Sequence, residues 1–166
     1  MRKIIVAILL STWTTVVLPA TICAHELKYE VKIGLLYHDI APVWGNTKVE
    51  GGYDVNAEII GHVLGNISAH VGFSLNLCGE TSRIYFGVTP VFNYHGVVFS
   101  GGIGCAIVGN YVRKLGSPLL FRVAGEIGYR FGPHSISIIL DHISNANLAE
   151  HNQGLDLLGV RYGIRW

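Results

Sequence analysis

Apolar and polar residues alternate with a period of two along most of the chain beyond residue 26. In YDVNAEI (residues 53–59) the odd-numbered residues are apolar and the even-numbered ones are Asp, Asn and Glu, and the pattern recurs in ISAHVGFSLNL (67–77) and FRVAGEIGYRF (121–131). This period is the signature of a β-strand with two different faces. Turn residues separate several of these segments. The pattern predicts eight strands, near residues 27–38, 49–61, 67–78, 83–94, 97–109, 119–131, 135–145 and 155–166.

The length and the two faces of these segments favour a membrane barrel. A strand of about 9–11 residues crosses a bilayer when it is tilted. One face is apolar and rich in aromatic residues, and the other carries Asp, Glu, Arg and His. A transmembrane barrel turns the first face to lipid and the second to its lumen. The chain ends on the alternating segment VRYGIRW, which resembles the assembly signal of bacterial outer-membrane barrels.

We therefore predict an all-β fold, an eight-stranded antiparallel transmembrane β-barrel of the bacterial outer membrane. The alternative is a soluble periplasmic or secreted β-sandwich, which would bury the apolar face against a second sheet. The composition favours the barrel, because 50% of the residues are hydrophobic and only 14% are charged. A net charge of +1 gives no basis for nucleic-acid binding.

The N-terminus predicts a secretory signal peptide. Met1, Arg2 and Lys3 form a basic start, residues 4–10 are apolar, and ATICA offers cleavage after Ala24. The alternative is a membrane anchor, which the hydroxyl residues at positions 11, 12, 14 and 15 disfavour. The expected organisation is a signal peptide at 1–24 and an outer-membrane β-barrel domain at 25–166.

Charged residues within the predicted strands are expected to face the lumen. Their simplest role is an internal charge network, and a proton or ion path is the alternative. These residues are Glu58, His70, Arg122, Glu126 and Arg130. The remaining histidines lie scattered near turns without the spacing of metal ligands, so neither a metal nor a cofactor is expected.

Three polar residues depart from the apolar face of the last two predicted strands. His142 and Ser144 continue the lipid-facing parity of Ile136 and Ile138, and Asp156 has the lipid-facing parity of the next strand. With eight strands and periplasmic termini, the loop between these strands is extracellular. His, Ser and a cross-strand acid on one surface are the components of a base-activated serine nucleophile. The alternative is a polar rim that leads into a loop.

The whole stretch HISNANLAEHNQGLDLLGVRY resembles the active-site region of the outer-membrane lipid A 3-O-deacylases, the PagL-type acyloxyacyl hydrolase family. The family pattern is His-x-Ser-Asn-Ala, then Asn-x-Gly, then an acid two residues after that glycine. The resemblance implies a serine hydrolase that needs no metal and removes the ester-linked acyl chain at the 3-position of lipid A. It implies the following roles: Ser144 as nucleophile, His142 as general base, Asp156 as orienting acid, and Asn152 with Asn145 and Gly154 around the oxyanion hole.

The chain departs from the family at one position. The best-known members carry Glu as the triad acid, whereas this chain has Asp156, one methylene shorter. Glu150 in the loop is a rival acid, and strand parity favours Asp156. The expected partners are lipid A or lipopolysaccharide as substrate and the lipids of the outer membrane, with the active site facing the outer leaflet. The sequence leaves the oligomeric state open, with a homodimer as one alternative.

The sequence is also compatible with two other functions. One is a non-enzymatic small outer-membrane barrel with a role in adhesion or membrane structure. The other is a different lipid-acting barrel enzyme, such as a phospholipase or an acyltransferase. The polar trio on the lipid face separates the enzymes from the structural barrel, and analysis of the products separates the enzymes from one another.

Overall fold

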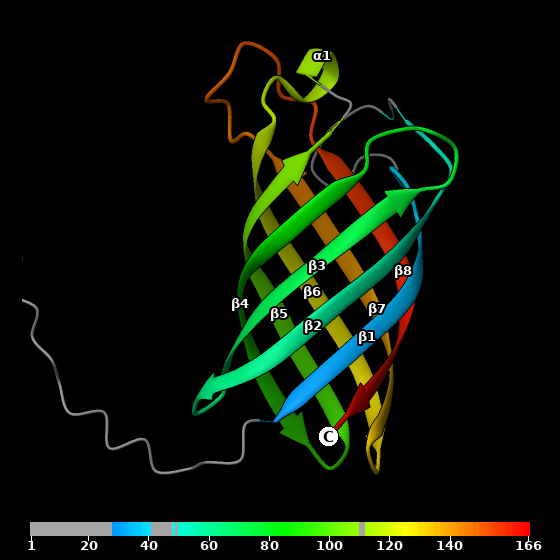
Figure 1. Cartoon of the computed structure of the whole chain (residues 1–166), viewed down its shortest axis with the longest axis vertical. Coiled ribbons are helices and arrows are strands. Elements are labelled where there is room, and N and C mark those ends of the chain that lie inside the picture. The colour runs from blue at the N-terminus through cyan, green and yellow to red at the C-terminus, as the bar shows by residue number, and fades with distance from the viewer. Residues whose placement is uncertain (1–27, 41–47, 49, 110–111) are drawn as a thin grey trace, which may run out of the picture.

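The computed structural model describes residues 28–40, 48, 50–109 and 112–166 and forms a closed antiparallel barrel (Figure 1). Each strand pairs with its neighbours in the sequence, and β1 pairs with β8 to close the wall. The prediction of an eight-stranded antiparallel barrel is confirmed. The strands are β1 Tyr29–Tyr37, β2 Tyr53–Leu64, β3 Ile67–Asn76, β4 Arg83–Tyr94, β5 Val97–Val108, β6 Leu119–Phe131, β7 His134–Ser144 and β8 Leu155–Arg165.

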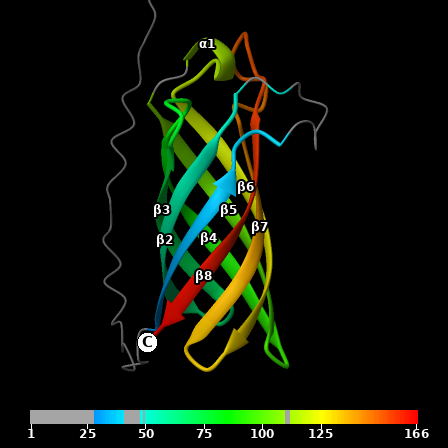
Figure 2. The same cartoon turned by 90° about the vertical axis from the view of Figure 1, so that its right-hand side faces the viewer.

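The two ends of the barrel differ (Figures 1 and 2). Hairpins join β2 to β3, β4 to β5 and β6 to β7 at one end, where β1 also begins and β8 also ends. We call this the short-turn end. The longer connections lie at the other end, which we call the loop end, and they include the β7–β8 loop and a single helical turn, α1 (Val112–Leu115). Within the described residues no helix is long and apolar enough to cross a membrane.

The alternation seen in the sequence becomes an inside and an outside. On β7, Ile136 and Ile138 are more than half exposed on the outer surface, whereas Ser135, Ser137 and Asp141 are buried in the lumen. The same parity runs along the other strands, so the outer surface is a continuous apolar band. Such a band is suited to hydrocarbon and would be unfavourable in water.

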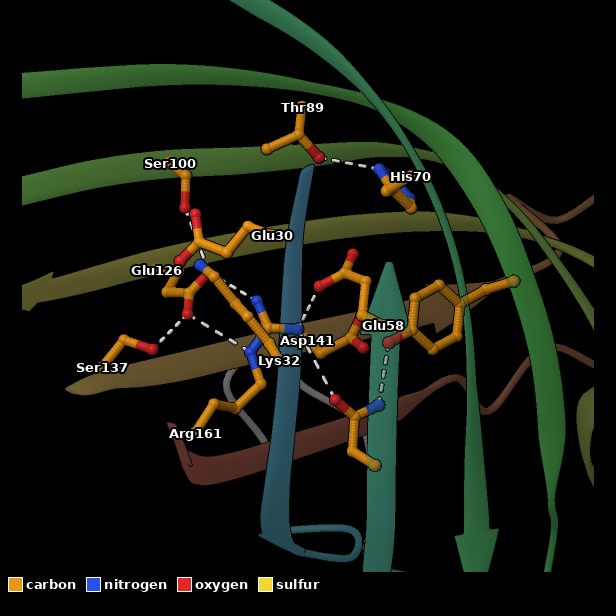
Figure 3. Close-up of polar contacts among 12 residues, drawn as sticks. Glu30, Lys32, Glu58, His70, Thr89, Ser100, Glu126, Ser137, Asp141 and Arg161 are labelled. Atoms are coloured by element: carbon orange, nitrogen blue, oxygen red, sulfur yellow. Dashed lines mark hydrogen bonds and ion pairs between the residues drawn. The ribbon is translucent and has the colours of Figure 1, made fainter. Parts of the chain in front are cut away.

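Paired charges occupy much of the lumen (Figure 3). Arg161 joins Glu58 and Glu126, and Lys32 approaches Glu126 to 2.9 Å. Nearer the loop end, Asp141 lies between Arg122 and Arg83, at 3.0 and 2.7 Å from their nitrogens. All of these side chains are almost inaccessible to solvent. The predicted internal charge network is therefore present.

Both ends of the second strand differ from the prediction. The sequence GHVLGN reads as a turn that ends the second strand near residue 61, but β2 continues to Leu64. The reversal is confined to Gly65 and Asn66, and Gly65 has a positive φ of 56°, which glycine adopts without strain. Strand β2 also begins at Tyr53 rather than at residue 49. The predicted signal peptide, 1–24, lies outside the described residues.

Candidate functional site

The register of β7 against β8 brings two of the predicted site residues into contact at the loop end. His142 and Asp156 are direct partners across the strand pair, so their side chains leave the sheet from the same face. His142 Nδ1 lies 2.8 Å from Asp156 Oδ1. The side chain of His142 is 18% exposed and that of Asp156 only 2% exposed. Asp156 is therefore largely shielded from solvent, although its neighbours Leu158 and Val160 on the same face are exposed.

Ser144 lies on the same outer face of β7, two residues beyond His142. Residues two apart on a strand are separated by about 6.6–7 Å along the chain, which is within reach of an imidazole and a hydroxyl that lean toward each other. Because Nδ1 of His142 faces the carboxylate, its Nε2 is the ring nitrogen directed away from the acid. Ser144 pairs in register with Phe121 of β6, so the hydroxyl group stands at the edge of an apolar surface.

The loop after Ser144 is held by the side chain of Asn145. This side chain is buried and donates to the carbonyl groups of Leu115, at 2.7 Å, and His151, at 2.6 Å. The main-chain amide of Asn145 donates to Asn152 Oδ1 at 3.0 Å. Two of the residues predicted around an oxyanion hole are thus in contact with each other.

The backbone of this loop turns sharply at both ends. Ala146 and Asn147 follow with positive φ values of 52° and 62°, and Asn152 Nδ2 donates to Asn147 Oδ1. Gly154, the third residue predicted near the oxyanion hole, has φ +61° immediately before β8. Left-handed backbone in non-glycine residues is uncommon and persists where surrounding contacts hold it.

Sequence reasoning missed the contact between two loops: the connection between β5 and β6 supports the β7–β8 loop. Gln153 N donates to Lys114 O, and a Cβ atom at Gly116 would lie only 1.9 Å from His151 O. Gly116 also has a positive φ of 72°, so its lack of a side chain serves both the turn and the close approach. An isolated glycine in LGSP was the available signal, but nothing in the sequence indicates which loop it contacts.

Sequence reasoning also set aside His38, which follows β1 and proves to be fully buried. Its Nδ1 lies 2.8 Å from Asp54 Oδ1 and its Nε2 lies 2.8 Å from Glu50 Oε2. Two residues further on, Ile40 N donates to the carbonyl oxygen of Asp156 at 2.9 Å. The segment 38–40 therefore extends the β1–β8 pairing as far as Asp156.

The His38 cluster makes the stability of the barrel depend on pH. Burial opposes the charge on His38, but hydrogen bonds and charges from Asp54 and Glu50 raise its pKa to about 9. Burial likewise opposes ionisation of Glu50, but hydrogen bonds from His38 and Thr81 lower its pKa to about 2. The histidine contribution is complete below its unfolded pKa near 6.5 and is lost as pH rises through 9. The Glu50 contribution is lost only as pH falls from 4.5 toward 2.

We expect the free energy of unfolding to fall by about 3 kcal/mol between pH 6 and pH 10 through His38 alone. Urea unfolding of the detergent-folded protein, followed by tryptophan fluorescence, measures the change. His38→Gln should be less stable at pH 6 and should show a smaller loss at pH 10. His151→Gln, the same substitution at an exposed loop histidine, should keep the full pH dependence. An unchanged pH dependence in His38→Gln would contradict the assignment.

Two apolar hollows include residues close in sequence to His142 and Ser144. A cavity of about 230 Å³ lies beside Asn145, and its lining includes Leu119, Phe121 and Leu148. A larger and more open hollow of about 540 Å³ lies on the outer surface, where Gly101 and Gly125 are partners across β5 and β6 and leave the wall without side chains. Its lining includes Leu140, two residues before His142. No group of three His, Cys, Asp or Glu side chains in the described part of the chain is arranged to hold a metal ion.

Comparisons with known proteins come from sequence families and from solved structures. The family model described as lipid A 3-O-deacylase (PagL) matches residues 35–165. No curated protein matches the chain in sequence. A de novo designed transmembrane β-barrel is 11% identical with a TM-score of 0.57, covering 84% of this chain and 95% of that one.

Two natural outer-membrane proteins are also similar in structure. Ail of Yersinia pestis, solved in a phospholipid bilayer nanodisc, is 13% identical with a TM-score of 0.51, covering 85% of this chain and 100% of that one. The crystal structure of the outer membrane enzyme PagL is 20% identical with a TM-score of 0.49, covering 82% of this chain and 98% of that one. At these identities the likenesses to the designed barrel and to Ail bear on the fold alone.

Proposed function

Because the chain belongs to the lipid A 3-O-deacylase (PagL) family, we propose that it hydrolyses the acyl ester at the 3-position of lipid A with Ser144 as nucleophile, His142 as general base and Asp156 as orienting acid. The protein is accordingly a lipid A hydrolase of the outer membrane. The observation that carries the residue assignment is the 2.8 Å contact between His142 Nδ1 and Asp156 Oδ1 on the same face as Ser144.

The contact with Asp156 determines which nitrogen of His142 acts as the general base. With Nδ1–H donated to Asp156, Nε2 is the basic nitrogen and accepts the proton of the Ser144 hydroxyl group. The serine oxygen then attacks the ester carbonyl carbon. Collapse of the tetrahedral intermediate breaks the bond to the sugar oxygen, which takes the proton from His142. Water, activated by the same nitrogen, then cleaves the acyl-serine and releases a fatty acid.

The loop of Asn145 and Asn152 is the proposed oxyanion site, together with the backbone before Gly154. In the resting loop the amide of Asn145 donates to Asn152 Oδ1. A developing oxyanion could replace that oxygen as the acceptor, and rotation of the Asn152 amide would present its NH₂ group to the same charge. Catalytic hydrogen bonds often form fully only in the complex with substrate. Loss of one such donor in a serine hydrolase costs about 2.7–4 kcal/mol of transition-state stabilisation.

The surroundings of Ser144 favour a lipid ester over a water-soluble one. The catalytic face is the outer surface of the barrel, and the hollow at Gly101 and Gly125 begins beside Leu140. A hydrocarbon chain in contact with this surface would hold its ester near the rim. We place the loop end, and with it the active site, in the outer leaflet, where the sugar of lipid A lies.

Product analysis of the wild-type protein tests the reaction. Purified lipid A is incubated with the detergent-folded protein, and both the lipid and the released chain are analysed by mass spectrometry. We expect lipid A lighter by one 3-position acyl chain, together with a stoichiometric amount of free fatty acid. The same preparation unfolded by heat is the control and should leave the lipid unchanged.

Other outcomes would redirect the proposal. Release of fatty acid from phospholipid in preference to lipid A would indicate a phospholipase. Transfer of the chain to an added acceptor lipid without free acid would indicate an acyltransferase. Unchanged lipid A with protein shown to be folded would contradict hydrolysis and favour a non-enzymatic barrel.

A further inference from the structure

At the short-turn end, cations outnumber carboxylates among the described residues of the lumen. Elsewhere in the described lumen each cation lies against a carboxylate, in the pairs Lys32–Glu126, Arg83–Asp141, Arg122–Asp141 and Arg161–Glu58. At the short-turn end the lumen opens into a polar cavity of about 310 Å³, and the described residues that line it include the cations Lys28, Arg130 and Arg165 and one acid, Glu30. We call this the mouth cavity. Three cations therefore share one carboxylate.

Each oxygen of that carboxylate already accepts a hydrogen bond. Glu30 Oε2 accepts a hydrogen bond from Arg130 Nη2 at 2.8 Å, and Oε1 accepts one from Ser135 at 2.9 Å. Within the described residues, Lys28 and Arg165 form no ion pair, and Arg130 Nε is buried without a hydrogen-bond partner. A buried donor without an acceptor costs roughly 1–3 kcal/mol, and more when the group is charged. Among the described residues, the mouth cavity thus has two cations without a carboxylate partner and at least one buried N–H group without an acceptor.

We propose that the mouth cavity binds a phosphate group between Arg130 and Arg165, with Lys28 as a further contact. A phosphate monoester carries about −1.5 to −2 charges at pH 7, which matches the surplus of two positive charges. Guanidinium groups bind such oxyanions through paired, charge-assisted hydrogen bonds. Asn93 and His62 also line the cavity and add polar groups around the anion. The space exceeds that of the anion itself, so an organic substituent on the phosphate also fits.

This site lies at the end of the barrel opposite His142 and Ser144 and does not depend on the hydrolytic reaction. The phosphate could come from a free ion or ester in solution, or from a lipid headgroup at the membrane surface. Both sources present the same oxyanion to the same cations. The two sources of phosphate differ in one respect: a lipid headgroup binds only when a lipid phase is present, whereas a free ion or ester binds from solution.

Isothermal titration of the full chain tests the proposal. The protein is folded in an uncharged detergent in buffer free of phosphate and sulfate, and inorganic phosphate is the first probe. We expect saturable binding at one site. Arg165→Gln and Lys28→Gln should each weaken it by roughly tenfold or more, because each removes a charged partner. Lys114→Gln, a cation at the loop end, is the matched control and should bind as the wild type does. Heat-modified mobility on gels shows that each variant is folded.

A second arm distinguishes the two sources. Mixed micelles that contain a short-chain phosphatidic acid replace inorganic phosphate, with phosphatidylcholine micelles as the comparison. Saturable binding to the phosphatidic acid alone, again weakened in Arg165→Gln, would assign the phosphate to a lipid headgroup. Absence of saturable binding to either probe would overturn the proposal. Equal binding by the wild type, Arg165→Gln and Lys28→Gln would also overturn it and would indicate an adventitious ion only.

Discussion

Replacement of Ser144 by alanine should lower the rate of lipid A deacylation by a factor on the order of 10⁶, to the background of the assay. The reason is that, in the proposed mechanism, the hydroxyl oxygen of Ser144 forms the covalent bond to the acyl group, and alanine has no atom that can form it. Binding of lipid A should persist, since the apolar surface at Gly101 and Gly125 is untouched. Time courses of fatty-acid release measure the effect, and co-sedimentation with substrate micelles measures binding.

The matched control is Ser137→Ala. This serine lies on the same strand but faces the lumen, where it donates to Glu126. The variant should keep activity within a fewfold of the wild type, because the two faces of a strand share no reacting atoms. Substantial activity in Ser144→Ala, or an equal loss in both variants, would remove Ser144 from the role of nucleophile.

Replacement of Asp156 by asparagine should lower kcat by roughly 10⁴ while the barrel stays folded. Asparagine keeps the shape of the side chain but loses the charge that stabilises protonated His142. Its NH₂ group can also donate to Nδ1 and so favour the wrong tautomer. The effect should fall on kcat rather than on KM, because the carboxylate contacts His142 and is too buried to contact a substrate at the surface.

Two further variants complete this test. Glu150→Gln removes the rival acid, which is exposed in the β7–β8 loop, and should leave kcat nearly unchanged. Asp156→Glu restores the acid found in the best-known family members and should keep a large part of the activity. If Glu150→Gln were the damaging substitution, the orienting acid would be the loop residue instead.

The alternation of side chains was enough to predict the barrel and the face of each site residue, because strand parity is local. His142, Ser144 and Asp156 could be placed on one surface from their positions in the sequence alone. The burial of Asp156 could not be predicted in this way. It depends on register with His142 and on the segment at Ile40, which comes from the opposite end of the sequence.

Contacts between loops and between residues far apart in the sequence could not be predicted from local patterns. His38 follows a strand near a turn in the sequence, and only the fold places Asp54 and Glu50 on either side of its ring. The contact of Gly116 with His151 joins two loops whose relative position no local pattern encodes. In the same way, Asn145 and Asn152 are predicted to lie around the oxyanion hole, and the structure adds that the main-chain amide of Asn145 donates to Asn152 Oδ1.

The proposed active-site residues His142 and Ser144 lie on the outer wall of the barrel, and in the proposed mechanism this position determines how the rate depends on the substrate. A site on the wall meets its substrate by lateral diffusion within the plane of the lipid, and the bulk solution plays no part in the encounter. The relevant concentration is then a surface density. In mixed micelles the rate should follow the mole fraction of lipid A and should stay constant when the whole sample is diluted. A Michaelis constant for this protein is accordingly a ratio of lipids, and a change in membrane composition alone would change its degree of saturation.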